Sequence, residues 1–340
     1  MKKNLPAKWI FAPLLAVLLA SCTTSPPAAS EKSLPVWPLP PDQPRIAYVR
    51  SLHGPRDIGQ SLSIFTRFGH WLTGENGESI ALQKPFGLAL DETGNLCVTD
   101  TGANLVCYLD FTHKKWRRYL ASGKTAFVSP VAVARRNGIF YVADSALGKV
   151  LAFRDDGKSA FEITNSLLRP VGLAIAGNSL AVVDSQAHDV SVFDFAGNFL
   201  FKFGKRGTGS GEFNFPTHIA ADASGHWLVT DSLNSRIQIF SDDGKFISQF
   251  GSSGDTSGHF GRPKGVAADS FGHIYVADAV FDNVQIFDVT GQLLLSFGQS
   301  GAGAGEFGLP NGVVIAPDNT IYIADGYNRR VQIFKYLGAQ

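Results

Sequence analysis

The sequence predicts an all-β protein, a six-bladed β-propeller built from four-stranded antiparallel blades. Three observations predict it. Six prolines recur at intervals of 40 to 47 residues, namely Pro85, Pro130, Pro170, Pro216, Pro263 and Pro310. Each is followed 14 or 15 residues later by an aspartate that ends an apolar run, namely Asp100, Asp144, Asp184, Asp231, Asp278 and Asp325. Between these markers, short apolar runs alternate with turns, and a repeat of this length with four strands is typical of a propeller blade.

The fifth repeat, residues 262–297, shows the strand pattern most clearly. Its four apolar runs are RPKGVAAD, IYVAD, VQIFD and LLLSFG, and short Gly-, Asp- or Asn-containing segments separate them, as in an antiparallel meander. The runs are nearly continuous rather than alternating, which indicates strands covered on both faces. Such repeats must stack around an axis to bury those faces. We expect the blades to start near residues 84, 129, 169, 215, 262 and 309.

The last repeat is one strand short, so closure of the ring needs a strand from elsewhere. It ends with VQIFKYLGAQ, its third strand. We expect Arg45–Val49 to supply the missing outer strand, which removes an open edge. Ile58, Leu62, Phe65, Phe68 and Leu72 follow at helical spacing and predict a short N-terminal amphipathic helix. The alternative is that residues 63–68 form the closing strand, because FTRFG resembles the fourth-strand segment FISQFG.

The first residues have the features of an export signal. Three lysines precede a short apolar run, and Leu19-Ala20-Ser21-Cys22 resembles the bacterial lipobox, which implies cleavage before Cys22 and lipidation of its thiol. An ordinary signal peptide with a chance cysteine is the alternative. We predict a lipoprotein signal peptide over 1–21, a lipidated Cys22 with a Pro-rich tether over 22–44, and the propeller over 45–340. A partner-binding Pro-rich motif is a second interpretation of the tether.

The same resemblance implies the location of the protein. Thr23 rather than Asp follows the cysteine, which resembles the enteric pattern for the outer membrane. We therefore expect a protein of the bacterial cell envelope, attached to the outer membrane by lipid on Cys22 and facing the periplasm. The whole chain has a net charge of +1, and loss of residues 1–21 would leave −2. This balance argues against nucleic-acid binding by bulk charge.

The repeats also resemble a known family. YVADAVFDNVQIFD, VTDSLNSRIQIFS and IADGYNRRVQIFK are similar to NHL repeats, in which an Asp precedes a short loop and an apolar-Gln-apolar-Phe strand. The first three copies keep the Asp and lose the Gln. The resemblance covers residues 80–337 and implies a six-bladed propeller. We expect the six aspartates to be scaffold, accepting backbone N–H groups at strand ends, and the glycine-rich loops to be blade connectors rather than phosphate-binding loops.

Cys97 and Cys107 lie on the second and third strands of the first blade. In an oxidising compartment they could form a cross-strand disulfide, and two buried thiols are the alternative. Neither a CxxC motif nor metal-cluster spacing is present.

The two residues after each repeated proline should line the mouth of the central channel. Only the last three blades place polar side chains there: Thr217, His218, Lys264 and Asn311. With the loop residues Arg236, Arg329 and Arg330 they form the predicted ligand or partner face, which should prefer a neutral or anionic ligand.

These residues predict no catalytic group, metal site or cofactor. NHL-like lyases use several channel histidines on zinc, whereas only His218 is at a ring position, and no acid is available there for a lactonase-type metal site. We therefore expect a monomeric binding or scaffolding module for a protein or an anionic envelope polymer, without nucleic acid. The alternative is a periplasmic propeller enzyme of lyase or lactonase type.

Overall fold

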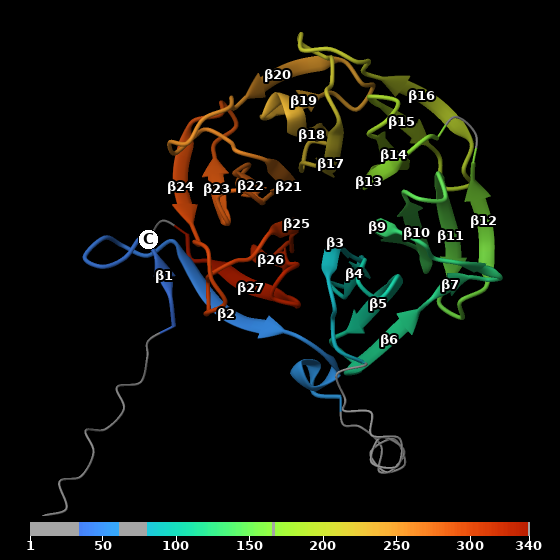
Figure 1. The fold of residues 1–340 in the computed structure, drawn as a ribbon, viewed down its shortest axis with the longest axis horizontal. Helices are drawn as coiled ribbons and strands as arrows, with labels where there is room; N and C mark the ends of the chain where they lie inside the picture. Colours follow the sequence, from blue (N-terminus) through green and yellow to red (C-terminus); the bar gives the residue numbers. More distant parts are fainter. Residues whose placement is uncertain (1–33, 61–79, 165–166, 339–340) are drawn as a thin grey trace, which may run out of the picture. The chain divides into compact units, whose positions relative to one another are not determined.

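The computed structural model describes residues 34–60, 80–164 and 167–338. These residues form six antiparallel sheets arranged in a ring around a central channel (Figure 1). Five sheets have four strands and the sixth has five. The prediction of an all-β, six-bladed propeller is therefore confirmed. No helix in this part of the chain is both long enough and apolar enough to cross a membrane.

The first three blades follow one another along the chain, each with its first strand at the channel. Blade one comprises β3 (Pro85–Leu90), β4 (Leu96–Asp100), β5 (Leu105–Asp110) and β6 (Lys115–Tyr119). A small hairpin of β7 (Ala121–Ser122) and β8 (Thr125–Ala126) precedes blade two, which comprises β9 (Pro130–Arg136), β10 (Ile139–Asp144), β11 (Lys149–Arg154) and β12 (Ser159–Ile163). Blade three comprises β13 (Pro170–Ala176), β14 (Ser179–Asp184), β15 (Asp189–Phe193) and β16 (Phe199–Phe203).

The last three blades repeat this order, and the sixth is completed by the N-terminal segment. Blade four comprises β17 (Pro216–Ala221), β18 (Trp227–Asp231), the 3-10 turn η3 (Ser232–Asn234), β19 (Arg236–Phe240) and β20 (Phe246–Phe250). Blade five comprises β21 (Pro263–Ala268), β22 (Ile274–Asp278), β23 (Asn283–Phe287) and β24 (Leu293–Phe297). Blade six comprises β25 (Pro310–Ile315), β26 (Thr320–Asp325), β27 (Arg330–Tyr336), β2 (Ile46–Leu52) and β1 (Val36–Trp37).

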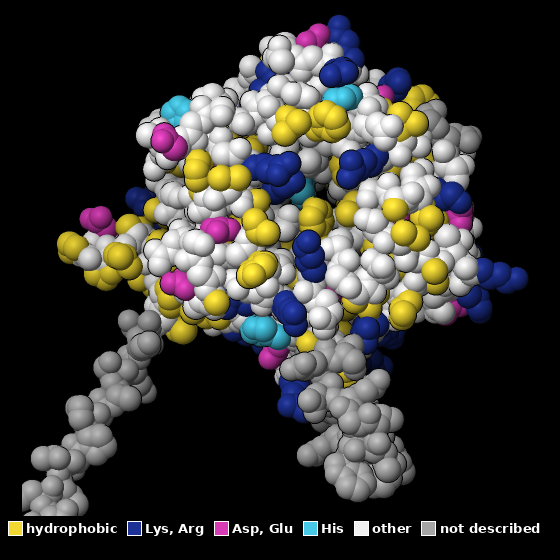
Figure 2. All heavy atoms as spheres, viewed as in Figure 1, with side chains coloured by type: hydrophobic (Ala, Val, Ile, Leu, Met, Phe, Trp, Pro, Cys, Tyr) yellow, Lys and Arg dark blue, Asp and Glu magenta, His cyan; other side chains and the backbone are white. Residues whose placement is uncertain are grey.

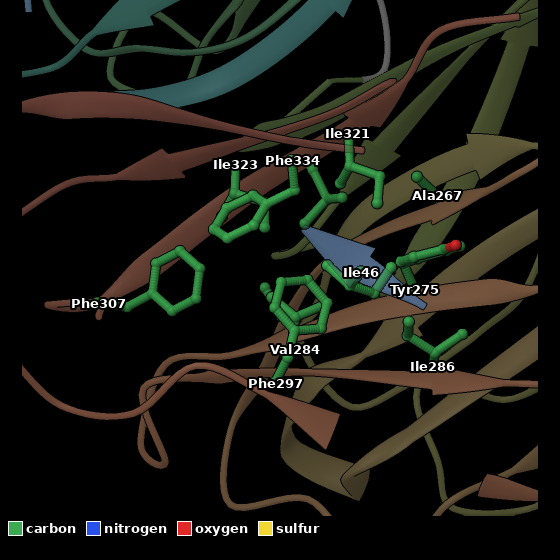
Figure 3. Close-up of a cluster of buried hydrophobic side chains, with 12 residues drawn as sticks. Ile46, Ala267, Tyr275, Val284, Ile286, Phe297, Phe307, Ile321, Ile323 and Phe334 are labelled. Atoms are coloured by element: carbon green, nitrogen blue, oxygen red, sulfur yellow. The ribbon is translucent and has the colours of Figure 1, made fainter. Parts of the chain in front are cut away.

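Strand β2 closes the ring, as the strand count predicts. It pairs antiparallel with β27, Ile46 lying opposite Tyr336 and Leu52 opposite Val331. Ile46 is fully buried in the core between blades five and six (Figure 3). The alternative strand over residues 63–68 lies outside the described residues, and the position beside β27 that it would need is occupied by β2.

The predicted tether is too long at its C-terminal end. The compact unit begins at Leu34, and β1 pairs with β2 within the range assigned to the tether. The indole ring of Trp37 lies 5.6 Å from the ring of Phe297 and 5.9 Å from that of Phe334. Trp37 lies on β1, one strand beyond the closing strand β2, and its ring buries apolar area against blade five. This burial explains why the Pro-rich segment packs here.

The predicted N-terminal helix has no support in the structure. The described residues contain no α-helix, and the segment after β2 is the 3-10 turn η1 (Pro55–Ile58). Gly59, with a left-handed φ of 79°, ends this turn directly after Ile58. Ile58 itself is buried between blades six and one. Most of the predicted helix falls on residues 61–79, which lie outside the described residues.

Stacking of blades creates six apolar cores, one between each pair of neighbours. Each core draws residues from two adjacent blades, and the core between blades five and six combines Tyr275 and Phe297 with Ile323 and Phe334 (Figure 3). The strands are covered on both faces, which explains why their apolar runs do not alternate.

The repeated aspartates are scaffold, as predicted. Asp278 accepts the backbone N–H groups of Gly261 and Arg262 before the first strand and of Val280 and Phe281 in the following loop. Asp100, Asp144 and Asp184 make equivalent bonds in their own blades. Each carboxylate therefore ties the start of the inner strand to the loop that follows the second strand.

Cys97 and Cys107 are both buried and unpaired, which matches the alternative of two buried thiols rather than a disulfide. In the observed register Cys97 lies opposite Tyr108, and Cys107 lies opposite Val98. The offset of one residue puts the two thiols on opposite faces of the sheet, because side chains alternate along a strand. Cys97 packs in the core toward blade two and Cys107 in the core toward blade six.

Candidate ligand site at the mouth of the central channel

The inner strands of neighbouring blades lie very close together at the second residue after a repeated proline. This residue is glycine in blades one, three, five and six. A Cβ on Gly87 would lie 2.5 Å from the carbonyl oxygen of Val131 in blade two, and one on Gly172 would lie 2.9 Å from that of Thr217. Ala132 and His218 take this position in the remaining blades, so His218 is the one large side chain that it presents to the channel.

His218 meets a ring from the opposite side of the channel. The imidazole of His218 in blade four is stacked on Phe86 of blade one, with ring centroids 5.8 Å apart and planes inclined by 25°. Below this pair, the inner strands leave a free volume of only about 40 Å³ in the channel. The stacked rings therefore form the floor of the hollow above them.

This hollow has a volume of about 440 Å³ and opens on the face that carries the loops after the repeated aspartates. We call it the loop-face cavity. Phe86, Val131, Val171, Phe215 and Leu233 supply its apolar lining. A cavity of this size with apolar walls and few polar groups is typical of a small-ligand site.

A second hollow of about 660 Å³ adjoins the loop-face cavity over blades five, six and one. The two share Lys84, Phe86, Arg262 and Lys264. Tyr327, which is 77% exposed, lines this second hollow. The depression on this face is therefore wider than the channel and carries exposed apolar surface.

Five cationic side chains surround the two hollows, namely Lys84, Arg169, Arg262, Lys264 and Arg329. No Asp or Glu of the described residues lines either hollow. None of the five takes part in an ion pair among the residues that the structure describes. Figure 2 shows Lys and Arg side chains gathered around the central opening, with a His side chain inside it. This mouth therefore carries a positive potential that favours anions.

The floor contains polar atoms without partners. Both ring nitrogens of His218 and the hydroxyl of Thr217 are shielded from solvent and make no hydrogen bond to the described residues. Burial of the imidazole, with the Lys264 ammonium as a second cause, lowers the pKa of His218 to about 3. His218 is therefore neutral at pH 7, with one ring N–H donor and one acceptor nitrogen.

Lys264 is half-buried at the edge of the floor. Burial, followed by repulsion from Arg262, lowers the pKa of its ammonium to about 8. An anion placed in the cavity would favour the protonated form of Lys264, since it would supply the negative charge that the lining lacks.

Two predicted site residues belong to the scaffold instead. Arg236 and Arg330 are each only 6% exposed. The Nε of Arg236 donates to Asp231 and that of Arg330 to Asp325, each at 2.8 Å. Nη2 of Arg236 and both Nη atoms of Arg330 donate to backbone carbonyls of the glycine-rich connectors, and Nη1 of Arg236 donates to the side chain of Gln249. Both arginines follow the loop after the repeated aspartate. Their guanidinium groups point into the protein, because in that position each donates to several buried acceptors at once.

The other predicted residues do line the face. Thr217, His218 and Lys264 lie in the loop-face cavity, and Asn311 and Arg329 line the second hollow. Asn311 is buried, and its amide donates to the carbonyl oxygen of Leu309.

The predicted ligand face contains residues of blades four to six alone. Lys84 of blade one and Arg169 of blade three also stand at the mouth. The signal was available in the residue that precedes each repeated proline, which is cationic in three of the six blades: Lys84, Arg169 and Arg262.

The opposite mouth of the channel is different in character. A hollow of about 300 Å³ there contains Asp91, Glu92, Arg135 and Arg136. Arg135 donates to Asp91 at 2.6 Å and to Asp155 at 2.9 Å, so its charge is already compensated. Within the described ranges, no group of three His, Cys, Asp or Glu residues could hold a metal ion.

Comparisons with known proteins support the repeat and the fold. The NHL repeat model matches residues 307–334, and a family model described as a 6-bladed beta-propeller matches residues 167–227. No curated protein shows significant sequence similarity to the chain.

Solved structures extend the likeness in fold over most of the chain. A streptogramin B lyase is 13% identical with a TM-score of 0.56, covering 76% of this chain and 95% of that one. A virginiamycin B lyase from Staphylococcus aureus is 15% identical with a TM-score of 0.56, covering 74% and 95%. A protein of unknown function from Bacteroides thetaiotaomicron is 13% identical with a TM-score of 0.60, covering 76% and 70%. At these identities the likeness shows the propeller fold alone.

Proposed function

We propose that this propeller is a non-enzymatic binding module that recognises an anionic group with attached apolar surface at its loop-face cavity. The observation that carries the proposal is the ring of five cations around hollows whose described lining contains no acid. Unpaired like charges repel one another, so a ligand that brings negative charge is favoured. Arginine also offers paired donors that match carboxylate and phosphate oxygens.

The apolar lining supports the other part of the proposal, the apolar surface of the ligand. Phe215, Leu233 and Tyr327 expose apolar area beside the cations. Covering such area contributes about 25 cal/mol per Å². A simple inorganic anion would leave it in contact with water, so a ligand with both characters fits this face best.

Charge reversal at the mouth tests the proposal, with 2-naphthoate as the anionic probe and 2-naphthylmethanol as its neutral counterpart. Arg169→Glu combined with Arg262→Glu should weaken naphthoate binding at least tenfold, about 1.4 kcal/mol. Lys158→Glu combined with Lys245→Glu is the matched control, because both lysines are exposed on turns outside the hollows. Equal binding of the two probes, or equal losses in the two double variants, would refute the proposal.

We further propose that the module is held at the bacterial outer membrane by lipid on Cys22. The support is the Leu19–Cys22 motif in the sequence. Two acyl chains anchor a protein stably, whereas a single chain does not. Cys22→Ala should move the protein out of the detergent phase on partitioning, and equal partitioning of the variant and the natural protein would contradict lipidation.

A propeller enzyme of lyase or lactonase type remains the alternative. Its support is the likeness in fold to the streptogramin B lyase. Fold by itself does not determine function. Among the described residues that line the two loop-face hollows, His218 is the one histidine and there is no carboxylate. The lining therefore favours binding over catalysis.

A further inference from the structure

We infer that the loop-face cavity takes its ligand anion-first, with a carboxylate or phosphate bound at the floor by Thr217, His218 and Lys264. The apolar part of the ligand then lies against the cavity walls, and the arginines remain at the rim. This inference rests on the proposed function and adds to it the depth and orientation of the ligand.

The unpartnered atoms at the floor carry the argument. Buried polar atoms in proteins almost always have hydrogen-bond partners, since an unsatisfied one destabilises the fold. Here three such atoms lie on adjacent residues, the two nitrogens of His218 and the hydroxyl of Thr217. Both residues line the cavity from its floor. By contrast, Ser129 and Ser145 in the same lining are hydrogen-bonded to each other at 3.0 Å.

The polar groups at the floor match an oxyanion. Thr217 offers a hydroxyl donor, neutral His218 offers one N–H, and Lys264 offers an ammonium. Three donors with a net positive charge suit carboxylate or phosphate oxygens. A ligand cation would meet Lys264 without any acid in the described lining to offset the repulsion.

The walls above the floor suit an apolar body. Val131 and Val171 stand on neighbouring blades, and Phe215 and Leu233 continue the lining. A flat ring system attached to the oxyanion can therefore lie along these side chains while its charged end reaches the floor.

Binding at the floor should take up a proton, and binding at the rim should not. The titratable and charged groups that share the hollows with Lys264 are Lys84, Arg169, His218, Arg262, Tyr327 and Arg329. All are cationic or neutral, so a bound anion supplies the negative charge that the described lining of the hollows lacks. Near pH 8 about half of the Lys264 side chains are neutral, and an anion at the floor draws them to the protonated form. Arginine stays protonated throughout, so an anion bound beside Arg169 or Arg329 and away from Lys264 changes no protonation state.

Isothermal titration calorimetry of the full chain with 2-naphthoate and 2-naphthyl phosphate tests the inference. At pH 8, the binding enthalpy measured in two buffers of different ionisation enthalpy gives the protons taken up. We expect about half a proton per bound ligand in the natural protein, and none in Lys264→Arg, which keeps the charge. The two probes distinguish a carboxylate ligand from a phosphate ligand by their relative affinity.

Two neutral substitutions test the floor without changing the charge of the mouth. His218→Phe keeps a ring beside Phe86, and Thr217→Val keeps the shape of the side chain, and each should weaken binding by about tenfold. Ser145→Ala is the matched control, because its hydroxyl already has a partner, and it should bind normally. Thermal melting confirms that each variant is folded.

The outcomes separate the two levels of the proposal. Charge-dependent binding without proton uptake, or with no effect of His218→Phe and Thr217→Val, overturns floor binding and leaves the proposed function intact. Binding that is indifferent to Arg169→Glu with Arg262→Glu, or absence of binding of both probes at millimolar concentration, overturns both.

Discussion

Arg329 and Arg330 are neighbours in the sequence with opposite roles, and replacing each in turn tests that assignment. Arg330→Met removes an ion pair to the fully buried Asp325, leaves the carbonyl group of Ala302 without its donor, and takes one donor from the carbonyl groups of Gly303 and Glu306. Removing one partner of a buried pair destabilises a protein by about 3–5 kcal/mol, because the remaining charge and acceptors stay buried. Arg329 is exposed and lines the second hollow, so Arg329→Met should change stability by less than about 0.5 kcal/mol.

Urea denaturation at pH 7, followed by tryptophan fluorescence, measures both free energies of unfolding. We expect a lower midpoint for Arg330→Met only, and weaker 2-naphthoate binding for Arg329→Met only. Arg236→Met should behave like Arg330→Met, since it holds Asp231 in the same way. Equal midpoints for the Arg329 and Arg330 variants would refute the distinction between surface and scaffold arginines.

Three further predictions follow from the structure. Trp37→Ala should lower the free energy of unfolding by about 2 kcal/mol, below the usual range for a fully buried tryptophan because Trp37 is only partly buried, and an unchanged urea midpoint would contradict its packing. Cys97 and Cys107, whose thiol pKa values are raised by burial, should react with a thiol reagent only after denaturation in a Cys22→Ser background, and a native disulfide found by mass spectrometry would disprove the observed register. Lys264→Met should stabilise the protein below pH 8, because the folded state lowers this pKa from 10.5 to about 8; the gain should shrink as the pH rises from 8 to 10.5, and a gain independent of pH would exclude Lys264 as its source.

The sequence by itself determined the architecture. The phased prolines and aspartates predict six blades because each aspartate acts within its own repeat. Its carboxylate binds backbone N–H groups before the first strand and in the loop after the second strand. The closing strand also follows from the sequence, since a last repeat of three strands leaves an edge that another segment must cover. Residues 46–52 supply it in the structure.

The predicted N-terminal helix and the predicted end of the tether show where the local sequence pattern was insufficient to predict the structure. Helical spacing from Ile58 competes with Gly59, which adopts a left-handed conformation and ends the turn there. Trp37 lies in a Pro-rich segment with no periodic signal, and it packs only because blade five presents aromatic side chains to it. Burial against a distant partner is not encoded in the pattern of the segment itself.

Only the tertiary structure decided the composition of the site. Arg236 and Arg330 follow loops that face the ligand side, yet buried carbonyl groups of the preceding connectors draw them inward. The floor joins Phe86 of blade one to His218 of blade four, residues brought together by closure of the ring. A sequence repeat shows which positions are equivalent, but the direction of a side chain depends on which unsatisfied groups lie within its reach in the folded ring.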